Sequence, residues 1–396
     1  LANVIGNTSI NIGTKTEIDF VSTPTHLTAN AETGKYPASG ANITGSVYGG
    51  GNAADIEGNT TVTIGTVDLT PTESNGKNGT KIGGDVFGGG FGETTTVTGD
   101  VEVNLGKKIE ATESTPESYV GFATISGDVY GGSAKGKFNA TKSGTAPNIT
   151  SAVSSGTPTT KVNFYGGTIA TGHSLYGGGY GEDNAAADVY GAVTVNVYGG
   201  TIPNVFGGNN LSGVTRDAVN VNIAGGTISE NVYGGGNNAD ALVDVTVTVT
   251  GGSMVDVFGG GKGQNTVVGG DVTVNIGAKD GNTLSGSGAV TGDVYGGSAL
   301  GAVNATKTTV ESVTTLSHTS DKETYVYIYS GTVTGNVFGG GLGIDDADDS
   351  KDVVAQNFGN TTVTMEAGTV STAVYGGANA NGVLLGNATV TISGGT

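Results

Sequence analysis

One short pattern recurs along the whole sequence and constrains what the chain can fold into. It joins a valine or leucine, an aromatic residue and two or three glycines, and it reads VFGGG at 86–90, 257–261 and 337–341. The aromatic residues of its ten copies are Tyr48, Phe87, Tyr130, Tyr176, Phe206, Tyr233, Phe258, Tyr295, Phe338 and Tyr375. Successive aromatic residues lie 25 to 46 positions apart, which indicates a unit of about 25 residues that accepts insertions.

A second pattern precedes most copies and alternates apolar residues with threonine or asparagine. It reads TTVTIG at 60, AVTVNVYGGT at 192, AVNVNIAGGT at 218, DVTVTVTGGS at 244, DVTVNIG at 271 and ATVTISGGT at 388. Strict alternation predicts a β-strand with one buried face. The predicted inward residues are Val62, Ile64, Val193, Val195, Val197, Val219, Val221 and Ile223. The predicted outward residues are Thr61, Thr63, Thr194, Asn196, Asn220 and Asn222.

One unit therefore reads as a strand, a glycine corner, a second short strand that ends in a glycine pair, and a variable polar segment. So short a unit buries its apolar face only by stacking on its neighbours. We predict an all-β fold, a parallel β-helix (β-solenoid) of about ten coils. An antiparallel sandwich or propeller is the alternative, but propeller blades run to about 40–50 residues.

The glycine pair has a conformational explanation, because glycine reaches positive φ and leaves room where coils stack closely. The aromatic residue before it would then form a stack of ten rings along the solenoid. Such a stack is either a structural ladder or an exposed stripe that binds sugar rings or another filament.

A longer period lies above the short one. VYGGGNAAD at 47 matches VYGGGNNAD at 232, and GDVYGGSAKG at 127 matches GDVYGGSALG at 292, with NATK following both at 139 and 304. We interpret residues 1–396 as one continuous solenoid with super-repeats of five coils at about 40–225 and 226–396. Residues 1–39 belong to the preceding coil and an insertion. The two ends are in phase and show no polar cap, so we expect a longer array or head-to-tail assembly.

The composition disfavours several partners. The net charge is −19 and Arg216 is the one arginine, so the sequence offers no basic patch for nucleic acid or an anionic membrane surface. No apolar stretch is long enough for a membrane span. The chain has no cysteine, which fits a bacterial surface protein without excluding the cytosol.

Polar insertions at Thr14–Ser39, Thr112–Ser118, Lys142–Thr160 and Lys307–Glu323 are expected to form loops on one side of the rod. Two acidic clusters occupy equivalent places in the two super-repeats. Their residues are Asp345, Asp346, Asp348, Asp349 and Asp352 in one, and Glu182, Asp183 and Asp188 in the other. Clustered carboxylates could bind calcium, although the spacing matches no known calcium loop, and a solvated acidic loop is the alternative.

No catalytic motif stands out, and no catalytic residue is assigned. His26, His173 and His318 are far apart, and the chain lacks a GxSxG motif. An active site would break the repeat at one place with unlike chemical groups, and we identify no such place. The outward threonines could form an ice-binding array, but the equivalent positions hold Glu102 and Asn104, Lys161 and Asn163, and Tyr325 and Tyr327.

The G-[DN]-V-[YF]-G-G-G repeats and the T-V-T-[VI]-x-G-G-T strands resemble the repeat regions of large bacterial surface proteins. These are adhesin-like and autotransporter-passenger-like β-helices, and the resemblance covers nearly all of the chain. It implies secretion, surface display, adhesion or fibre formation, and by analogy a right-handed helix, and it transfers no catalytic residue.

The leading hypothesis is a non-enzymatic extracellular structural or adhesive rod whose partners are other copies of itself, a surface glycan or a surface protein. The first alternative is a glycan-binding module that uses an aromatic stripe and acidic, calcium-assisted loops. A polysaccharide-active β-helix enzyme is a third and weaker reading.

Overall fold

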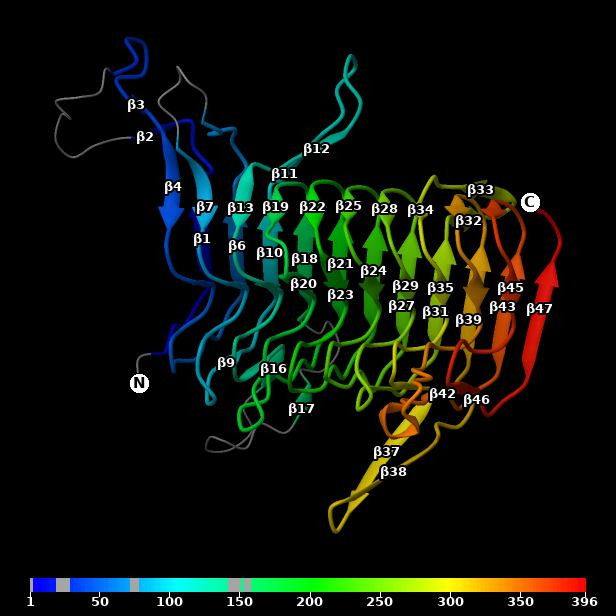
Figure 1. The fold of residues 1–396 in the computed structure, drawn as a ribbon. Coiled ribbons are helices and arrows are strands. Elements are labelled where there is room, and N and C mark those ends of the chain that lie inside the picture. The colour runs from blue at the N-terminus through cyan, green and yellow to red at the C-terminus, as the bar shows by residue number, and fades with distance from the viewer. Residues whose placement is uncertain (1–2, 19–28, 72–77, 142–150, 153–157) are drawn as a thin grey trace.

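The computed structural model describes residues 3–18, 29–71, 78–141, 151–152 and 158–396. Three long parallel sheets run side by side along a rod, and each coil of the chain contributes one strand to each sheet in turn (Figure 1). The predicted parallel β-helix is therefore confirmed. In the described part of the chain the only helix is the short 3₁₀ turn η1 (Asp349–Lys351).

Sheet 1 contains the alternating strands. Its eleven members are β1 (Thr8–Ile12), β6 (Thr60–Ile64), β10 (Val101–Leu105), β18 (Thr160–Phe164), β21 (Val193–Val197), β24 (Val219–Ile223), β27 (Val245–Val249), β31 (Val272–Ile276), β39 (Thr324–Ile328), β43 (Thr361–Met365) and β47 (Ala388–Ile392). Neighbouring strands pair in register, so that Val195 lies between Val162 and Val221. The inward residues predicted from the alternation are 0–1% exposed and form the core, and the predicted outward ones are half-buried.

Sheet 2 follows sheet 1 in each coil and has ten mostly short strands. They are β4 (Gly40–Ile43), β7 (Gly79–Ile82), β13 (Ala123–Ile125), β19 (Thr168–Ile169), β22 (Thr201–Ile202), β25 (Thr227–Ile228), β28 (Ser253–Met254), β34 (Ala289–Val290), β40 (Thr332–Val333) and β44 (Thr369–Val370). The expectation of two strands per coil is therefore wrong. Two residues are too few to show the alternation by which a strand is recognised in a sequence.

Sheet 3 contains the valine–aromatic pairs of the recurring pattern. Its ten strands are β5 (Val47–Tyr48), β8 (Val86–Phe87), β14 (Val129–Tyr130), β20 (Ser174–Tyr176), β23 (Asn204–Phe206), β26 (Val232–Tyr233), β29 (Val257–Phe258), β35 (Val294–Tyr295), β41 (Val337–Phe338) and β45 (Val374–Tyr375). The aliphatic residue of each pair faces the core of the rod. The ring faces the opposite way and belongs to a separate apolar cluster.

A fourth row of short strands and single bridges closes each coil between sheets 3 and 1. Its strands are β9 (Thr96–Val97), β15 (Lys137–Phe138), β30 (Val267–Val268), β36 (Ala302–Val303), β42 (Ala355–Asn357) and β46 (Gly382–Leu384). Single parallel bridges such as Val189–Thr215 and Thr215–Ala241 link the intervening coils.

The insertions leave the rod at two corners and form antiparallel hairpins. Three of them lie between sheets 1 and 2: β2 (Glu17–Ile18) with β3 (Tyr36–Pro37), β11 (Lys107–Ile109) with β12 (Ser118–Val120), and β32 (Ala278–Asp280) with β33 (Thr283–Ser285). Two precede sheet 1: β16 (Ala140–Thr141) with β17 (Ser151–Ala152), and β37 (Ala305–Val310) with β38 (Val313–His318).

Figure 1 shows these hairpins on opposite edges of the rod. The expectation of loops on one side is therefore wrong, because a coil tolerates an insertion at either corner where the backbone turns at the surface. Parts of the insertions Thr14–Ser39 and Lys142–Thr160, including His26, lie outside the described residues.

The glycine pair after each sheet 3 strand is required mainly because the coils stack closely, and less because of an unusual backbone conformation. A Cβ on Gly234 would lie 2.2 Å from the carbonyl oxygen of Gly259 in the next coil and 2.5 Å from a methyl group of Val245. The φ angle of Gly234 is not positive, whereas Gly226, in the corner between sheets 1 and 2, has φ of +85°. The two corners therefore select glycine for different physical reasons.

Candidate functional site

The ten aromatic residues of sheet 3 form one continuous stack. Neighbouring ring centroids lie 4.6 to 5.1 Å apart, and neighbouring planes differ by at most 10°. The eight rings from Phe87 to Phe338 are only 1–6% exposed, while Tyr48 is half-buried and Tyr375 is 48% exposed. A ligand therefore has no continuous row of ring faces to contact here, and the burial favours a structural ladder.

Buried hydroxyl groups in this stack bond to side chains from distant coils. Asn210 Nδ2 donates to the Tyr130 hydroxyl (2.8 Å), and Asn379 Nδ2 donates to the Tyr295 hydroxyl (3.0 Å). The same contact thus recurs between residues that the super-repeat makes equivalent. Burial raises the pKa of both tyrosines, so their hydroxyl groups remain protonated and donate to Asp128 (3.1 Å) and Asp293 (2.9 Å).

A ladder of hydrogen bonds from backbone N–H groups to capping side chains connects successive coils, and the sequence alone does not reveal it. In most coils the residue just before the sheet 3 pair accepts a hydrogen bond from the backbone N–H of the same position one coil later. Asp85 accepts from Asp128 (2.9 Å), Asp256 from Asp293 (2.7 Å) and Asp293 from Asn336 (2.6 Å). The sequence shows this residue as the [DN] of the G-[DN]-V-[YF] pattern, but it does not show which group bonds to its side chain.

The same device precedes strands in two other rows. Before sheet 1, Asp244 accepts from the N–H of Asp271 (2.8 Å), and before the fourth row Asp240 accepts from the N–H of Val267 (2.9 Å). Lysines neutralise some of these stacked carboxylates, since Lys322 Nζ lies 2.7 Å from Asp244 and 3.1 Å from Asp271. Burial alone would raise the pKa of Asp244, but its bonds to Lys322 and to the backbone lower it.

Two buried asparagines at equivalent places, Asn139 and Asn304, fasten the bases of insertions. Asn304 Nδ2 donates to the carbonyl oxygens of Gly270 and Glu323 (2.9 Å each), and its Oδ1 accepts from the Thr324 hydroxyl (2.8 Å). Asn139 makes the matching three bonds. Both have φ above +50°, a conformation that asparagine tolerates better than most residues.

The first acidic cluster is used mostly in local hydrogen bonds. Asp352 accepts from the N–H of Asp346 (2.8 Å), Asp346 from that of Asp348 (2.9 Å), and Asp348 from that of Ser350 (3.2 Å). Bonds to Ser350 and Lys351 lower the pKa of Asp348. Asp345 and Asp349 are exposed.

The carboxylates of the second acidic cluster do not converge. Glu182 pairs with Lys135 (2.8 Å), and Asp188 is buried, lies 3.6 Å from Arg216 and accepts from the N–H of Val214, while Asp183 is exposed. Within the described ranges, no three aspartate, glutamate, histidine or cysteine side chains gather where they could hold a metal ion.

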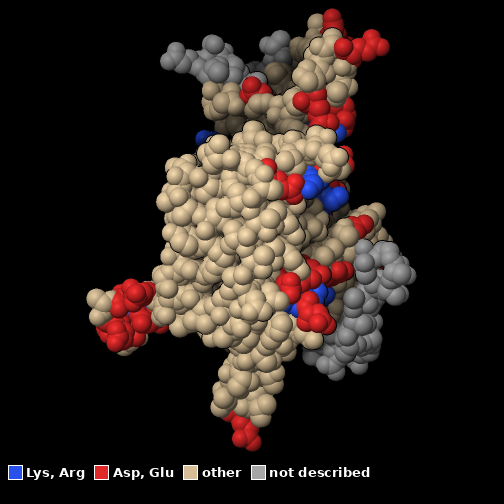
Figure 2. Space-filling model, turned by 90° about the vertical axis from the view of Figure 1, so that its right-hand side faces the viewer, with Lys and Arg blue, Asp and Glu red and all other residues tan. Residues whose placement is uncertain are grey.

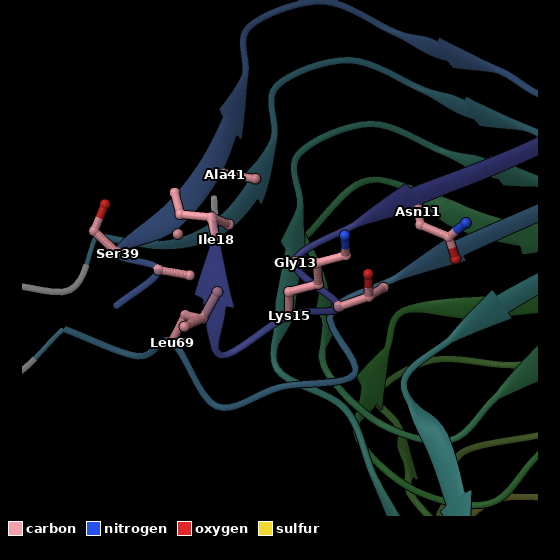
Figure 3. Close-up of a pocket in the computed structure, with 10 residues that line it drawn as sticks. Asn11, Gly13, Lys15, Ile18, Ser39, Ala41 and Leu69 are labelled. Atoms are coloured by element: carbon pink, nitrogen blue, oxygen red, sulfur yellow. The ribbon is translucent and has the colours of Figure 1, made fainter. Parts of the chain in front are cut away.

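One hollow lies near the first coil, between β1 and β4 (Figure 3). Its volume is about 750 Å³, and its wall includes Asn11, Lys15, Ile18, Ser39 and Leu69. Lys15 is the one charged residue among the described residues of the wall, and these include no acid–base pair.

The described residues include no helix of the length and apolarity that a membrane span requires. No protein-family model matches the chain, and no curated protein or solved structure is significantly similar to it.

Proposed function

We propose that this chain is a non-enzymatic structural or adhesive protein of the bacterial cell surface, which acts as a stiff rod. The observation that carries the proposal is the uninterrupted register of three parallel sheets from the first coil to the last. Stacking at about 4.8 Å per coil makes the rod about 50 Å long, and bending it requires all three sheets to deform together. The resemblance of the repeats to bacterial surface β-helices supports the extracellular location, and the lack of cysteine is compatible with it.

The proposal includes end-to-end assembly. Among the described residues, one edge of β1 and one edge of β47 have no strand beside them. At the edge of β47, two side chains on the core-facing side of the strand are accessible to solvent. Val390 is 42% exposed and Ile392 is 60% exposed. Charged residues lie around the rim of this end and on the projecting segments, while the end itself is largely uncharged (Figure 2). Such an edge favours pairing with another strand.

Electron microscopy of the purified polypeptide over a concentration series tests this function, with calcium in one arm and a chelator in the other. Filaments whose length grows with concentration would support assembly, and single rods of about 50 Å at every concentration would contradict it. Compact particles without a long axis would contradict the rod itself. Calcium acting through the acidic clusters would appear as a difference between the two arms.

A further inference from the structure

The outer face of sheet 1 breaks its repeat at one strand. Ten strands carry serine, threonine, asparagine, glutamate or lysine at the two outward positions in register with Tyr325 and Tyr327. Strand β39 has tyrosine at both, and Tyr329 follows at its end. The equivalent strand of the other super-repeat, β18, has Lys161 and Asn163 there, so the fold does not need the rings of Tyr325 and Tyr327.

The three rings form a row along the strand. The centroids of Tyr325 and Tyr327 lie 6.2 Å apart, those of Tyr327 and Tyr329 lie 5.4 Å apart, and both pairs of planes are parallel within 5°. All three side chains are half-buried, in contrast to the rings of the sheet 3 stack. The row is therefore accessible from solvent and aligned in one orientation.

Polar groups border the row. The hydroxyl of Tyr325 donates to Glu323 (3.0 Å), and Lys279 Nζ lies 5.8 Å from the centroid of Tyr329 and bonds both carboxylate oxygens of Glu366 (2.7 Å each). The outward threonines of β43 flank Tyr325 and Tyr327 on one side, and Thr273 and Asn275 of β31 flank them on the other.

A shallow hollow adjoins the end of the row. Its volume is about 340 Å³, and Thr248, Asn275, Lys279 and Tyr329 are among the residues of its wall. Hairpin β32–β33 supplies Lys279, so the insertion and the strand build this wall together. Apolar ring surfaces next to a few fixed polar groups are the usual composition of a small-molecule site.

We propose that the tyrosine row of Tyr325, Tyr327 and Tyr329, together with the hollow beside Lys279, binds a neutral linear oligosaccharide. The rings are stacked, so their solvent-facing edges and the outer faces of the row would pack against the C–H groups of sugars, and the amide, hydroxyl and ammonium groups around them can bond to sugar hydroxyls. The ring spacing of 5.4 to 6.2 Å is of the size of one sugar residue in a linear chain.

Charge and composition favour this ligand over others. The ammonium group of Lys279 is paired with Glu366, and Glu323 lies at the other end of the row, so an acidic polysaccharide would meet no free cation among these residues. The buried core of a protein–protein interface is more apolar than the rest of the surface. The outward neighbours here are threonine and asparagine.

The test replaces Tyr327 with the residue that nearby strands carry. Tyr327→Thr restores the repeat, because Thr248 and Thr364 occupy the same row, so we expect the variant to fold. Tyr327→Phe keeps the ring, and Tyr198→Thr removes an outer tyrosine in the other super-repeat. Each protein is titrated calorimetrically with β-1,4-linked glucose and mannose hexasaccharides, an α-1,4-linked glucose hexasaccharide, an oligogalacturonate and a decaproline peptide.

We expect a neutral hexasaccharide to bind the wild type, Tyr327→Phe and Tyr198→Thr, and Tyr327→Thr to bind at least about tenfold more weakly. Three outcomes would overturn the proposal. In the first, the wild type binds no neutral hexasaccharide. In the second, Tyr327→Thr binds as tightly as the wild type while its circular dichroism is native. In the third, only the peptide or the oligogalacturonate binds. The rod and its assembly do not depend on this site, so filament growth by Tyr327→Thr separates the two proposals.

Discussion

At the scale of single residues, the polar side chains that matter most are those that connect one coil to the next. Asp256 accepts from the N–H of Asp293 and faces the carboxylate of that residue in the ladder before sheet 3. Burial and this neighbouring charge raise the pKa of Asp256, although the backbone bond opposes them. Asn204 and Asn231 accept the same bond without a charge, so the ladder needs the acceptor oxygen rather than the carboxylate.

Asp256→Asn should therefore stabilise the fold at pH 7. A pKa that is higher in the folded state means that the carboxyl group favours folding most below its unfolded pKa, and that this contribution is lost as the pH rises through the folded value. The amide keeps the acceptor and removes the repulsion, which is worth ~0.5 kcal/mol for stacked like charges. Thermal melts from pH 7 to pH 3 should show an advantage for the variant that shrinks toward acid. Asp256→Ala, which lacks the acceptor, should be less stable than the wild type at both ends of the range.

Asn304 is expected to be the most sensitive polar residue among those described. Asn304→Ala removes three buried hydrogen bonds and keeps the strained backbone, which we expect to cost about 3 kcal/mol of unfolding free energy. Asn304→Gly also lacks the side-chain bonds but relieves the backbone strain, so it should be more stable than Asn304→Ala by roughly 1 kcal/mol. Urea unfolding followed by circular dichroism measures both differences. Equal stability of the alanine variant and the wild type would contradict the role assigned to the side chain.

At the scale of the strand, the short elements of sheets 2 and 3 are stable because they pair with parallel strands of the same sheet in the neighbouring coils. Strands of two residues, such as β26 and β29, would not be stable as isolated hairpins. Here the valine of each packs in the common core and the ring packs on the ring of the next coil, 5.1 Å from Tyr233 to Phe258. This spacing leaves no room for a side chain at the glycine that follows.

Gly234→Ala should therefore be strongly destabilising, by about 3 kcal/mol. The added methyl group would meet the backbone of the next coil, which cannot move without disturbing sheet 3. Gly377 is the matched control, because it belongs to the last glycine pair, has no atom within 4 Å of a built Cβ, and is not at positive φ. Melting temperatures of the two alanine variants would show this difference. A similar loss at both positions would mean that glycine is needed for conformation and not for space.

At the scale of the whole molecule, the described residues form a rod with hairpins on two edges, polar side chains on most of the outer face of sheet 1, and β1 and β47 as its edge strands. Its polar groups are bonded along the rod as well as around each coil. The ladder Asn163–Asn196–Asn222 on the outer face of sheet 1, with amide bonds of 2.9 Å, is one example. Each coil is thus stabilised mainly by its two neighbours.

Ile392→Glu should prevent the proposed end-to-end assembly. The side chain is 60% exposed at the open edge of β47, so a charge there should leave the single rod folded but oppose burial against Ile12 of a second copy. Thr391→Glu is the control, since residue 391 faces outward on the same strand. Light scattering during the concentration series should rise for the control and stay flat for Ile392→Glu. Equal growth of both variants would contradict pairing through this edge.

The parallel β-helix was predictable because two sequence patterns recur in every super-repeat. One is the alternation that forms sheet 1, and the other is the valine–aromatic–glycine pattern that forms sheet 3. The short strands of sheet 2 were not predictable, since a pair such as Thr201–Ile202 has no period. The role of the glycine pair was predicted only in part, because a sequence does not show how near the next coil lies.

Tyr325 and Tyr327 were visible in the sequence as exceptions to the threonine pattern. Their relation to Lys279 and Glu366 depends on how a hairpin folds back over the sheet, and these two residues are 87 positions apart. The acidic clusters are a different case. Residues such as Asp346 and Asp352 have the side chains that calcium prefers, and what the sequence does not show is that their oxygens accept local backbone N–H groups in the structure.

The capping ladders also have a direction, and it matters for how such a chain is made. In every rung the side chain belongs to the earlier coil and the N–H to the later one, as from Asn231 to Asp256 and from Asp256 to Asp293. A ribosome releases the earlier coil first, so each completed turn already presents the acceptor that the next turn needs. We therefore expect vectorial folding during synthesis, in which the growing rod is the template for its own extension.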